Sequence, residues 1–175
     1  MKSHVVDVRS LVLDVPDFPK KGIVFKDITP LLADPQGFAA VIDQMAEPFI
    51  GQGVGIVAGI ESRGFLLATP IAYKLGAGVV PIRKKGKLPR KTHSASYDLE
   101  YGQDSIEAHC DAFKPETKVL LVDDVLATGG TAKAACELIA KVGGKVVGLS
   151  FLIELGFLSG RKKLPSQTIR SLITY

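Results

Sequence analysis

The most constraining feature of the chain is an apolar run that passes directly into two carboxylates, a turn of small residues and a helical pattern. The apolar run covers residues 118–122, the carboxylates are Asp123 and Asp124, and the helical pattern covers residues 130–142. A short apolar run with clear ends is typical of a strand buried on both faces of a parallel sheet. A strand that feeds a helix through a tight turn predicts an α/β fold.

The rest of the chain repeats this alternation of strand and helix. Apolar runs punctuated by glycine predict three further strands, at residues 54–59, 78–82 and 145–153. Helical patterns also cover residues 35–50 and 64–75. We therefore expect an α/β fold with a central, mostly parallel sheet flanked by helices on both sides.

Two stretches interrupt the alternation, residues 14–30 and residues 83–104. Both are rich in polar or basic residues, and we expect irregular or hairpin insertions there. Ligands of open α/β sheets bind beyond the carboxyl ends of the strands. Insertions at such positions are therefore expected to serve as lids or specificity loops.

The composition is that of one domain with an apolar core, because 46% of the 175 residues are apolar and 23% are charged. No repeat or linker divides the chain, so we expect a single domain over residues 1–175. No run of about 18 apolar residues occurs, and residues 1–9 lack the apolar stretch of a secretory signal, which predicts a cytoplasmic protein that does not span a membrane. The two cysteines, Cys110 and Cys136, are expected to be buried free thiols.

The basic residues do not indicate a nucleic-acid-binding protein. The net charge is +4, but the basic residues gather in residues 83–91, where no aromatic residues are interleaved with them. Interleaved aromatics are what a surface for single-stranded nucleic acid requires. A small polyanion is the more economical partner.

The turn after residue 126 predicts a phosphate site. Its residues are small or carry a hydroxyl group: Ala127, Thr128, Gly129, Gly130 and Thr131. The two glycines permit positive φ and close approach, so successive backbone N–H groups can point at one anion. The dipole of the following helix adds about 0.3–1 kcal/mol for an exposed anion.

The acid pair refines this prediction. Asp123 and Asp124 would repel a bare phosphate, so we expect them to face ribose hydroxyls, which makes the segment a candidate ribose 5-phosphate site. The simpler interpretation is a strand end followed by an N-capped helix, where Asp and Thr are common. The chain lacks the phosphate motifs G-x-x-x-x-G-K-[ST] and G-x-G-x-x-G at a helix start.

This segment resembles the phosphoribosyl-pyrophosphate motif of type I phosphoribosyltransferases. Its form, Val-Asp-Asp-Val-Leu-Ala-Thr-Gly-Gly-Thr, is similar to that of the adenine-specific members. Three further segments match in the same order: residues 24–30 the family's hood, residues 61–65 its pyrophosphate loop and residues 83–102 its flexible catalytic loop. The resemblance implies a type I phosphoribosyltransferase fold with an N-terminal hood from residues 14–30 and a flexible loop at residues 83–104.

Residue roles follow from the resemblance. The implied pyrophosphate-binding residues are Ser62, Arg63, Arg83, Lys84 and Lys87. Arginine suits bidentate contact with phosphate, and Arg63 follows a predicted strand at its carboxyl end. The family also places a non-proline cis peptide within residues 61–65.

The implied base site takes residues from three segments. Phe25 and Val125 would sandwich a purine, and backbone groups around Val24 would read the Watson–Crick edge of adenine. Glu100 matches the family's general acid/base at N7 of the base.

The implied reaction is displacement at ribose C1 of phosphoribosyl pyrophosphate by adenine, a purine-salvage reaction. His4, His93 and His109 have no ligand spacing, so no metal is expected to be held directly by the protein. Mg²⁺ is expected to arrive bound to the substrate. The resemblance further implies a homodimer.

Two other functions fit the same fold. One is transfer to another purine base, which Phe25 and residues 99–102 disfavour. The other is a regulator that binds phosphoribosyl pyrophosphate without chemistry. A regulator of this kind is expected to carry a nucleic-acid-binding domain, for which 175 residues leave no space beyond the core.

Overall fold

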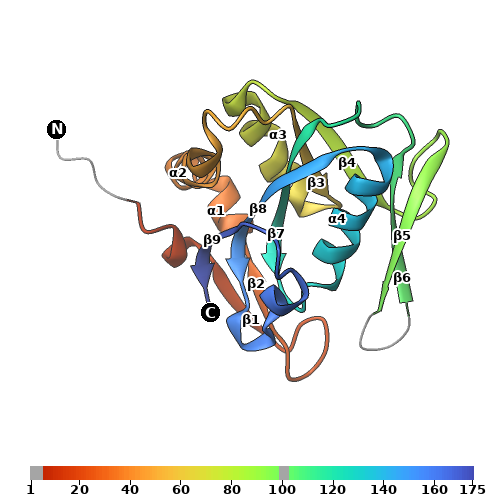
Figure 1. Ribbon diagram of the computed structural model, residues 1–175. Coiled ribbons are helices and arrows are strands. Elements are labelled where there is room, and N and C mark those ends of the chain that lie inside the picture. Colours follow the sequence, from red (N-terminus) through yellow and green to blue (C-terminus); the bar gives the residue numbers. More distant parts are fainter. Residues whose placement is uncertain (1–5, 99–102) are drawn as a thin grey trace. The chain divides into compact units, whose positions relative to one another are not determined.

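A seven-stranded sheet is the framework of the chain from Met45 to Tyr175, one of the two compact units of the protein (Figure 1). The computed structural model describes residues 6–98 and 103–175. The strands lie in the order β5-β6-β4-β3-β7-β8-β9. Their bounds are β3 Ile56–Ile60, β4 Gly78–Lys84, β5 Thr92–Asp98, β6 Gln103–His109, β7 Lys118–Leu126, β8 Lys145–Glu154 and β9 Ile169–Thr174.

The pairing of the strands confirms the mostly parallel sheet. Strand β3 is parallel to β4 and β7, and β7, β8 and β9 continue in parallel, whereas β6 is antiparallel to β4 and β5. The side chains of Val119, Leu120, Leu121 and Val122 are all fully buried. This matches an apolar run that forms a central strand covered on both faces.

Two helices flank the sheet, α3 Arg63–Leu75 between β3 and β4, and α4 Gly130–Val142 between β7 and β8. Helix α3 packs on β3, β4 and β7, whereas α4 packs on β5 to β8. The two crossovers leave the adjacent strands β3 and β7 in opposite directions along the sheet. Because such crossovers are right-handed, the two helices cover opposite faces, as predicted.

The other unit runs up to Gln44 and contains a β-hairpin. Its elements are η1 Val8–Leu11, β1 Leu13–Pro16, β2 Val24–Asp27, α1 Thr29–Ala33 and most of α2 Pro35–Ala46. Strands β1 and β2 are antiparallel, with Val15 opposite Phe25. The predicted insertion at residues 14–30 is therefore a hairpin followed by the start of a helix.

Some predicted boundaries were wrong. The helix predicted over residues 35–50 ends at Ala46 and continues as the 3-10 turn η2 Glu47–Phe49. Pro48 explains this end, since proline cannot donate the helical hydrogen bond and collides with the preceding turn. Strand β7 runs to Leu126, past the predicted end at residue 122, because Asp123 and Val125 still pair with Phe151 and Ile153 of β8.

The two cysteines differ in exposure. Both cysteines are free, Cys136 is half-buried and Cys110 is exposed, so the prediction of burial was wrong for Cys110, which follows the end of β6. Burial raises the pKa of the Cys136 thiol to about 11. Among the helices of residues 6–98 and 103–175, none has the length and apolar character needed to cross a membrane.

Candidate functional site

The topology itself marks one position for a ligand. Strands β3 and β7 are neighbours, yet the chain leaves β3 toward one edge of the sheet and leaves β7 toward the other. A crevice opens beyond the carboxyl ends of two such strands, and ligands of open α/β sheets bind there. Glu61, Ser62 and Arg63 follow β3 at this position, and Ala127 follows β7.

The loop after β7 lines an open cavity of about 70 Å³. The cavity is lined by Asp123, Val125, Leu126, Ala127, Thr128, Gly129, Gly130, Thr131, Ala132 and Phe151. The structure thus brings together all of the residues predicted to hold a 5-phosphate, and one of the two acids.

Helix α4 begins at this cavity. Gly129 is its N-cap with φ of 78°, a left-handed conformation that favours glycine, and the first helical hydrogen bond runs from the amide of Lys133 to the carbonyl of Gly129. The amides of the first turn therefore have no acceptor within the helix. Amides at a helix N-terminus together with the helix dipole form a suitable site for an anion.

The two adjacent acids have different surroundings. Asp124 is buried, with 6% of its surface exposed, and its Oδ2 lies 2.6 Å from Nε of Arg63. This contact is an ion pair without the angle of a hydrogen bond. Asp124 therefore connects the end of β7 to the first residue of α3.

Asp123 lines the cavity and is partly exposed. Its Oδ1 accepts a hydrogen bond from the amide of Asp124 at 2.9 Å. Burial, and next the charge of Asp124, raise the pKa of the Asp123 carboxyl well above its ordinary value, while the charge of Arg63 opposes the shift. A positive or hydroxyl-bearing group of a ligand would favour the ionised form.

The segment after β3 has the backbone feature that the family resemblance implied. The peptide bond between Glu61 and Ser62 is cis, and the amide of Phe65 donates to the carbonyl of Ser62 at 3.2 Å. Arg63 opens helix α3 beside the acids of β7. Ser62 and Arg63 thus lie at the carboxyl ends of the central strands, as predicted, and their contact with pyrophosphate remains a prediction.

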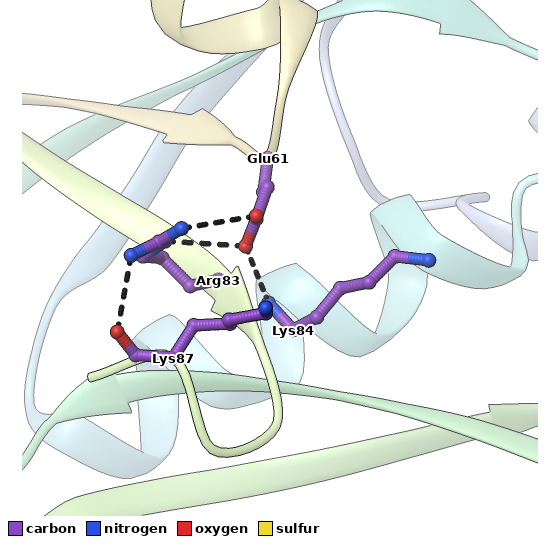
Figure 2. Close-up of polar contacts among 4 residues, drawn as sticks. All are labelled: Glu61, Arg83, Lys84 and Lys87. Atoms are coloured by element: carbon purple, nitrogen blue, oxygen red, sulfur yellow. Dashed lines mark hydrogen bonds and ion pairs between the residues drawn. The ribbon is translucent and has the colours of Figure 1, made fainter.

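Glu61 is a residue of this site that the sequence alone did not single out (Figure 2). Arg83 donates from Nε to Glu61 Oε2 at 3.2 Å and from Nη2 to Oε1 at 3.0 Å, and the amide of Lys84 donates to Oε2 at 3.0 Å. The hydrogen bonds from Arg83 are the largest cause of a lowered pKa of Glu61. In the parallel register of β3 and β4, Ile60 pairs with Ile82. Glu61 follows Ile60 and Arg83 follows Ile82, so knowledge of this register would have predicted the contact.

The basic turn after β4 is held from two sides. Besides Glu61, the buried Glu107 of β6 accepts from the amide of Gly86 at 3.0 Å. Arg83 also donates from Nη1 to the carbonyl of Lys87 at 3.0 Å (Figure 2). Arg83, predicted to contact pyrophosphate, thus uses two donors on Glu61 and one on the turn, while the side chains of Lys84 and Lys87 are exposed.

Tyr97 of β5 is a second residue that the sequence did not single out. Its hydroxyl donates to Asp104 Oδ2 at 3.3 Å and also interacts with the side chain of Thr131. Burial is the largest cause of a raised pKa of the Tyr97 phenol. The β5–β6 hairpin thereby contacts the helix that begins at the phosphate loop.

The residues predicted to bind adenine belong to different units. Val24 is about half exposed, and the ring of Phe25 makes an edge contact with Phe18 at a centroid distance of 5.1 Å, both within the unit that ends at Gln44. Val125 belongs to β7 and lines the cavity. The sandwich of a purine between them remains a prediction, and Glu100 lies outside the described residues.

Comparisons with known proteins agree on one family. The family model of the phosphoribosyl transferase domain matches residues 28–169. An adenine phosphoribosyltransferase of Acidothermus cellulolyticus is 59% identical over 166 residues, which are 95% of this chain and 94% of that protein. The enzyme of the same name from Thermobifida fusca is 57% identical over 163 residues, covering 93% of both proteins.

Solved structures give the same result. A crystal structure of adenine phosphoribosyltransferase from Rhodothermus marinus has a TM-score of 0.93 and 50% identity, covering 96% of both chains. The Saccharomyces cerevisiae adenine phosphoribosyltransferase, in complex with an imino-altritol bisphosphate and adenine, has a TM-score of 0.89 and 38% identity. It covers 94% of this chain and 95% of its own.

Proposed function

Because the chain belongs to the adenine phosphoribosyltransferase family, we infer that it transfers the 5-phosphoribosyl group of phosphoribosyl pyrophosphate to N9 of adenine. The products are AMP and pyrophosphate, so the reaction salvages a free purine. The observation that carries the inference in the structure is the cavity lined by Asp123 and by Ala127 to Thr131 at the carboxyl ends of β3 and β7.

The phosphate loop is proposed to bind the 5-phosphate of the donor. The cavity is small, lies at the start of helix α4 and has Thr128, Gly129, Gly130 and Thr131 among its lining residues, which suits a phosphate better than a base. Binding there fixes the ribose relative to the sheet. Such positioning contributes a large part of catalysis in a displacement reaction with no covalent step on the protein.

The two acids are proposed to act differently. Asp123 lines the cavity and would accept hydrogen bonds from ribose hydroxyls. Asp124 is buried against Arg63 and would hold that guanidinium toward the leaving pyrophosphate. Of the ribose contacts predicted for both acids, we therefore retain the one to Asp123 as the stronger proposal.

Magnesium is implied by the family resemblance, and the carboxylate of Asp123 in the cavity fits a substrate whose ribose hydroxyls bind the ion. Within the part of the chain that the structure describes, no group of three or more His, Cys, Asp or Glu side chains could hold a metal ion. Mg²⁺ prefers oxygen ligands and usually keeps substrate phosphates among them. We propose that diphosphate oxygens and ribose hydroxyls hold it, with Asp123 binding those hydroxyls. When bound, the ion neutralises charge on the departing pyrophosphate.

Bond exchange at ribose C1 completes the proposal. The C1–O bond to pyrophosphate breaks, C1 becomes oxocarbenium-like and the bond to N9 forms. The base releases its proton from N7, and the carboxylate of Glu100 accepts it. Glu100 is proposed to hydrogen-bond N7 as the general acid/base, and Glu100→Gln should lower kcat much more than it raises the Kd for phosphoribosyl pyrophosphate. Equal loss in both quantities would contradict this role.

The test of the function is a panel of bases. The wild-type chain is incubated with phosphoribosyl pyrophosphate, Mg²⁺ and adenine, hypoxanthine, guanine or xanthine, and nucleotide and pyrophosphate are quantified. We expect AMP and pyrophosphate in equal amounts from adenine. Consumption of another base but not adenine would refute the specificity, and no reaction with any base would favour the non-catalytic regulator.

A further inference from the structure

The segment after β8 lies directly against the phosphate loop although it does not line the cavity. This segment, named here the support segment, covers residues 155–164 and contains η3 Gly156–Leu158 and η4 Gly160–Lys163. The amide of Leu155 donates to the carbonyl of Leu126 at the end of β7, at 2.9 Å. This bond joins the first residue of the support segment to the residue that directly precedes the phosphate loop.

Gly160 is the point of closest approach between the two. A Cβ atom on Gly160 would lie 3.1 Å from the amide nitrogen of Gly129 and 3.2 Å from the carbonyl carbon of Ala127, and it would lie still closer to the carbonyl oxygen of Ala127. A Cβ atom on Gly129 would in turn collide with the carbonyl group of Gly160. Backbone therefore packs against backbone here, with no room for one methyl group.

Conformation does not explain a glycine at this position. Gly129 has the left-handed φ of 78°, but Gly160 is outside that region of φ. Alanine could adopt the backbone angle of Gly160 without strain. Only the close approach to the loop requires the missing side chain.

The support segment is anchored firmly enough to transmit a displacement to the loop. Arg161 donates from Nε and Nη2 to the two carboxylate oxygens of Glu154, each at 2.7 Å, and from Nη1 to the carbonyl of Ile169 at 3.3 Å. Leu164 is buried, with 4% of its surface exposed, in the core cluster that includes residues of α4. A group inserted at Gly160 would therefore move the loop as well as the support segment.

We propose that Gly160 is a positioning residue for the 5-phosphate of the donor. Its bare backbone supports the carbonyl of Ala127 and the amide of Gly129 from outside the cavity and so sets the direction of the loop amides. The proposal rests on the proposed function, because it assumes that the loop of residues 127–131 holds this phosphate.

The test compares two ligands on two alanine variants. Gly160→Ala is matched with Gly55→Ala, since a Cβ on the exposed Gly55 would meet Thr117 Cγ2 at an ordinary 3.4 Å. Calorimetry measures the affinity for two ligands, ribose 5-phosphate and pyrophosphate with Mg²⁺. In the proposed function only ribose 5-phosphate binds to the loop of residues 127–131. Loss of one charge-assisted hydrogen bond from a loop amide to the phosphate corresponds to about a ten- to a hundredfold change in affinity, so Gly160→Ala should weaken ribose 5-phosphate binding by this factor. Pyrophosphate affinity, and both affinities of Gly55→Ala, should stay at the wild-type values.

The outcomes separate the inference from the function. Unchanged ribose 5-phosphate affinity in Gly160→Ala, with a wild type that binds it and forms AMP, overturns the inference alone. An equal loss of affinity for both ligands in Gly160→Ala overturns it too, because such a loss indicates that the substitution disturbs the fold as a whole. A wild type that neither binds ribose 5-phosphate nor forms AMP refutes the proposed function and the inference with it.

Arg161→Met provides a second variant in case Gly160→Ala does not fold. It removes the ion pair to Glu154 without adding a group beside the loop. Selective loss of ribose 5-phosphate affinity supports the inference. Equal affinity for ribose 5-phosphate in Arg161→Met and wild type overturns it.

Discussion

Asp123 and Asp124 show how two identical neighbours acquire different properties from their surroundings. Asp124 has the guanidinium of Arg63 at 2.6 Å, whereas Asp123 lines the cavity and carries a raised pKa. An acid whose pKa is raised on folding destabilises the fold at pH values above its ordinary pKa, since the charged form is less favourable in the folded state. The ionised carboxylate of Asp123 thus lowers the free energy of unfolding at neutral pH, although the proposed ribose contact needs this form.

Asp123→Asn is predicted to separate stability from activity. Removing a charge that the fold disfavours should stabilise the free protein at pH 7 by about 0.5–2 kcal/mol, the usual range for a single stabilising substitution. The same change should lower kcat/KM for phosphoribosyl pyrophosphate by about tenfold, equivalent to about 1.4 kcal/mol. Urea unfolding and steady-state kinetics measure the two effects, and a less stable, fully active variant would contradict the account.

The pH dependence of kcat/KM is a second test of the role of Asp123. The ionised carboxylate is the form that accepts ribose hydroxyls, so wild-type kcat/KM for the donor should fall on acidification at a higher pH than for an ordinary aspartate. Asp123→Asn should lose that limb of the profile while retaining lower activity.

At the scale of elements, Glu61 connects the end of β3 to the turn after β4. Its pKa is lowered, chiefly by the hydrogen bonds from Arg83. A group whose pKa falls on folding adds stability above its unfolded pKa, and that stability is lost as the pH falls through the folded pKa. The stabilisation by Glu61 should therefore be complete at neutral pH and decline below the ordinary value of 4.5.

Glu61→Gln is predicted to cost about 1 kcal/mol at pH 7, because a charged pair with several hydrogen bonds is replaced by neutral contacts at a partly exposed position. The difference from wild type should shrink below pH 4.5, as chemical unfolding at several pH values can measure. The exposed pair of Arg90 and Asp111 provides a control, and Asp111→Asn should have no measurable effect. A constant difference between Glu61→Gln and wild type at every pH would contradict the assignment.

The strands show what the sequence could and could not predict. Four strands of the sheet were found because their sequences are mostly apolar, as in Val119 to Val122. Strands β5, β6 and β9 were not identified individually, since they include polar residues such as Ser94, Ser96 and Arg170, and cross-strand pairing rather than local composition forms them. The same pairing carries β7 through Asp123 and Asp124, which the sequence placed after the strand.

Some residues of the candidate site could likewise be predicted from the sequence, and others could not. Local motifs located the phosphate loop and Arg63, because a turn of consecutive small residues is visible in the sequence. Glu61 lies in the matched segment of residues 61–65, but its contact with Arg83 joins positions far apart in the chain and is not visible in that motif. Gly160 lies in no matched segment, and its close approach to Ala127 is likewise a contact between distant positions. Such contacts depend on strand register and on the packing of loops.

At the scale of the whole molecule, the family model crosses the boundary between the two units, since it matches residues 28–169 and the first unit ends at Gln44. We therefore propose that both units act as one phosphoribosyltransferase domain. The hairpin of residues 13–27 would then supply the hood, with Phe25 available to the base.

A homodimer is a further expectation at this scale. Helix α3 exposes Leu66 and Tyr73, with 51% and 91% of their surfaces accessible, and family resemblance places a subunit contact near this helix. Sedimentation velocity should give about twice the chain mass of 18.6 kDa for the wild type and a smaller mass for Leu66→Arg. A monomeric wild type at micromolar concentration would contradict the expectation.

The most direct test of the account is a crystal structure of the wild-type chain with AMP. We predict phosphate oxygens within hydrogen-bond distance of the amides of Thr128 to Thr131, ribose hydroxyls at Asp123, and the purine between Phe25 and Val125. A neighbouring pocket of about 200 Å³, lined partly by Lys133 and Lys163, offers the phosphate an alternative position. A phosphate bound there, with the cavity at residues 123–132 empty, would contradict the account.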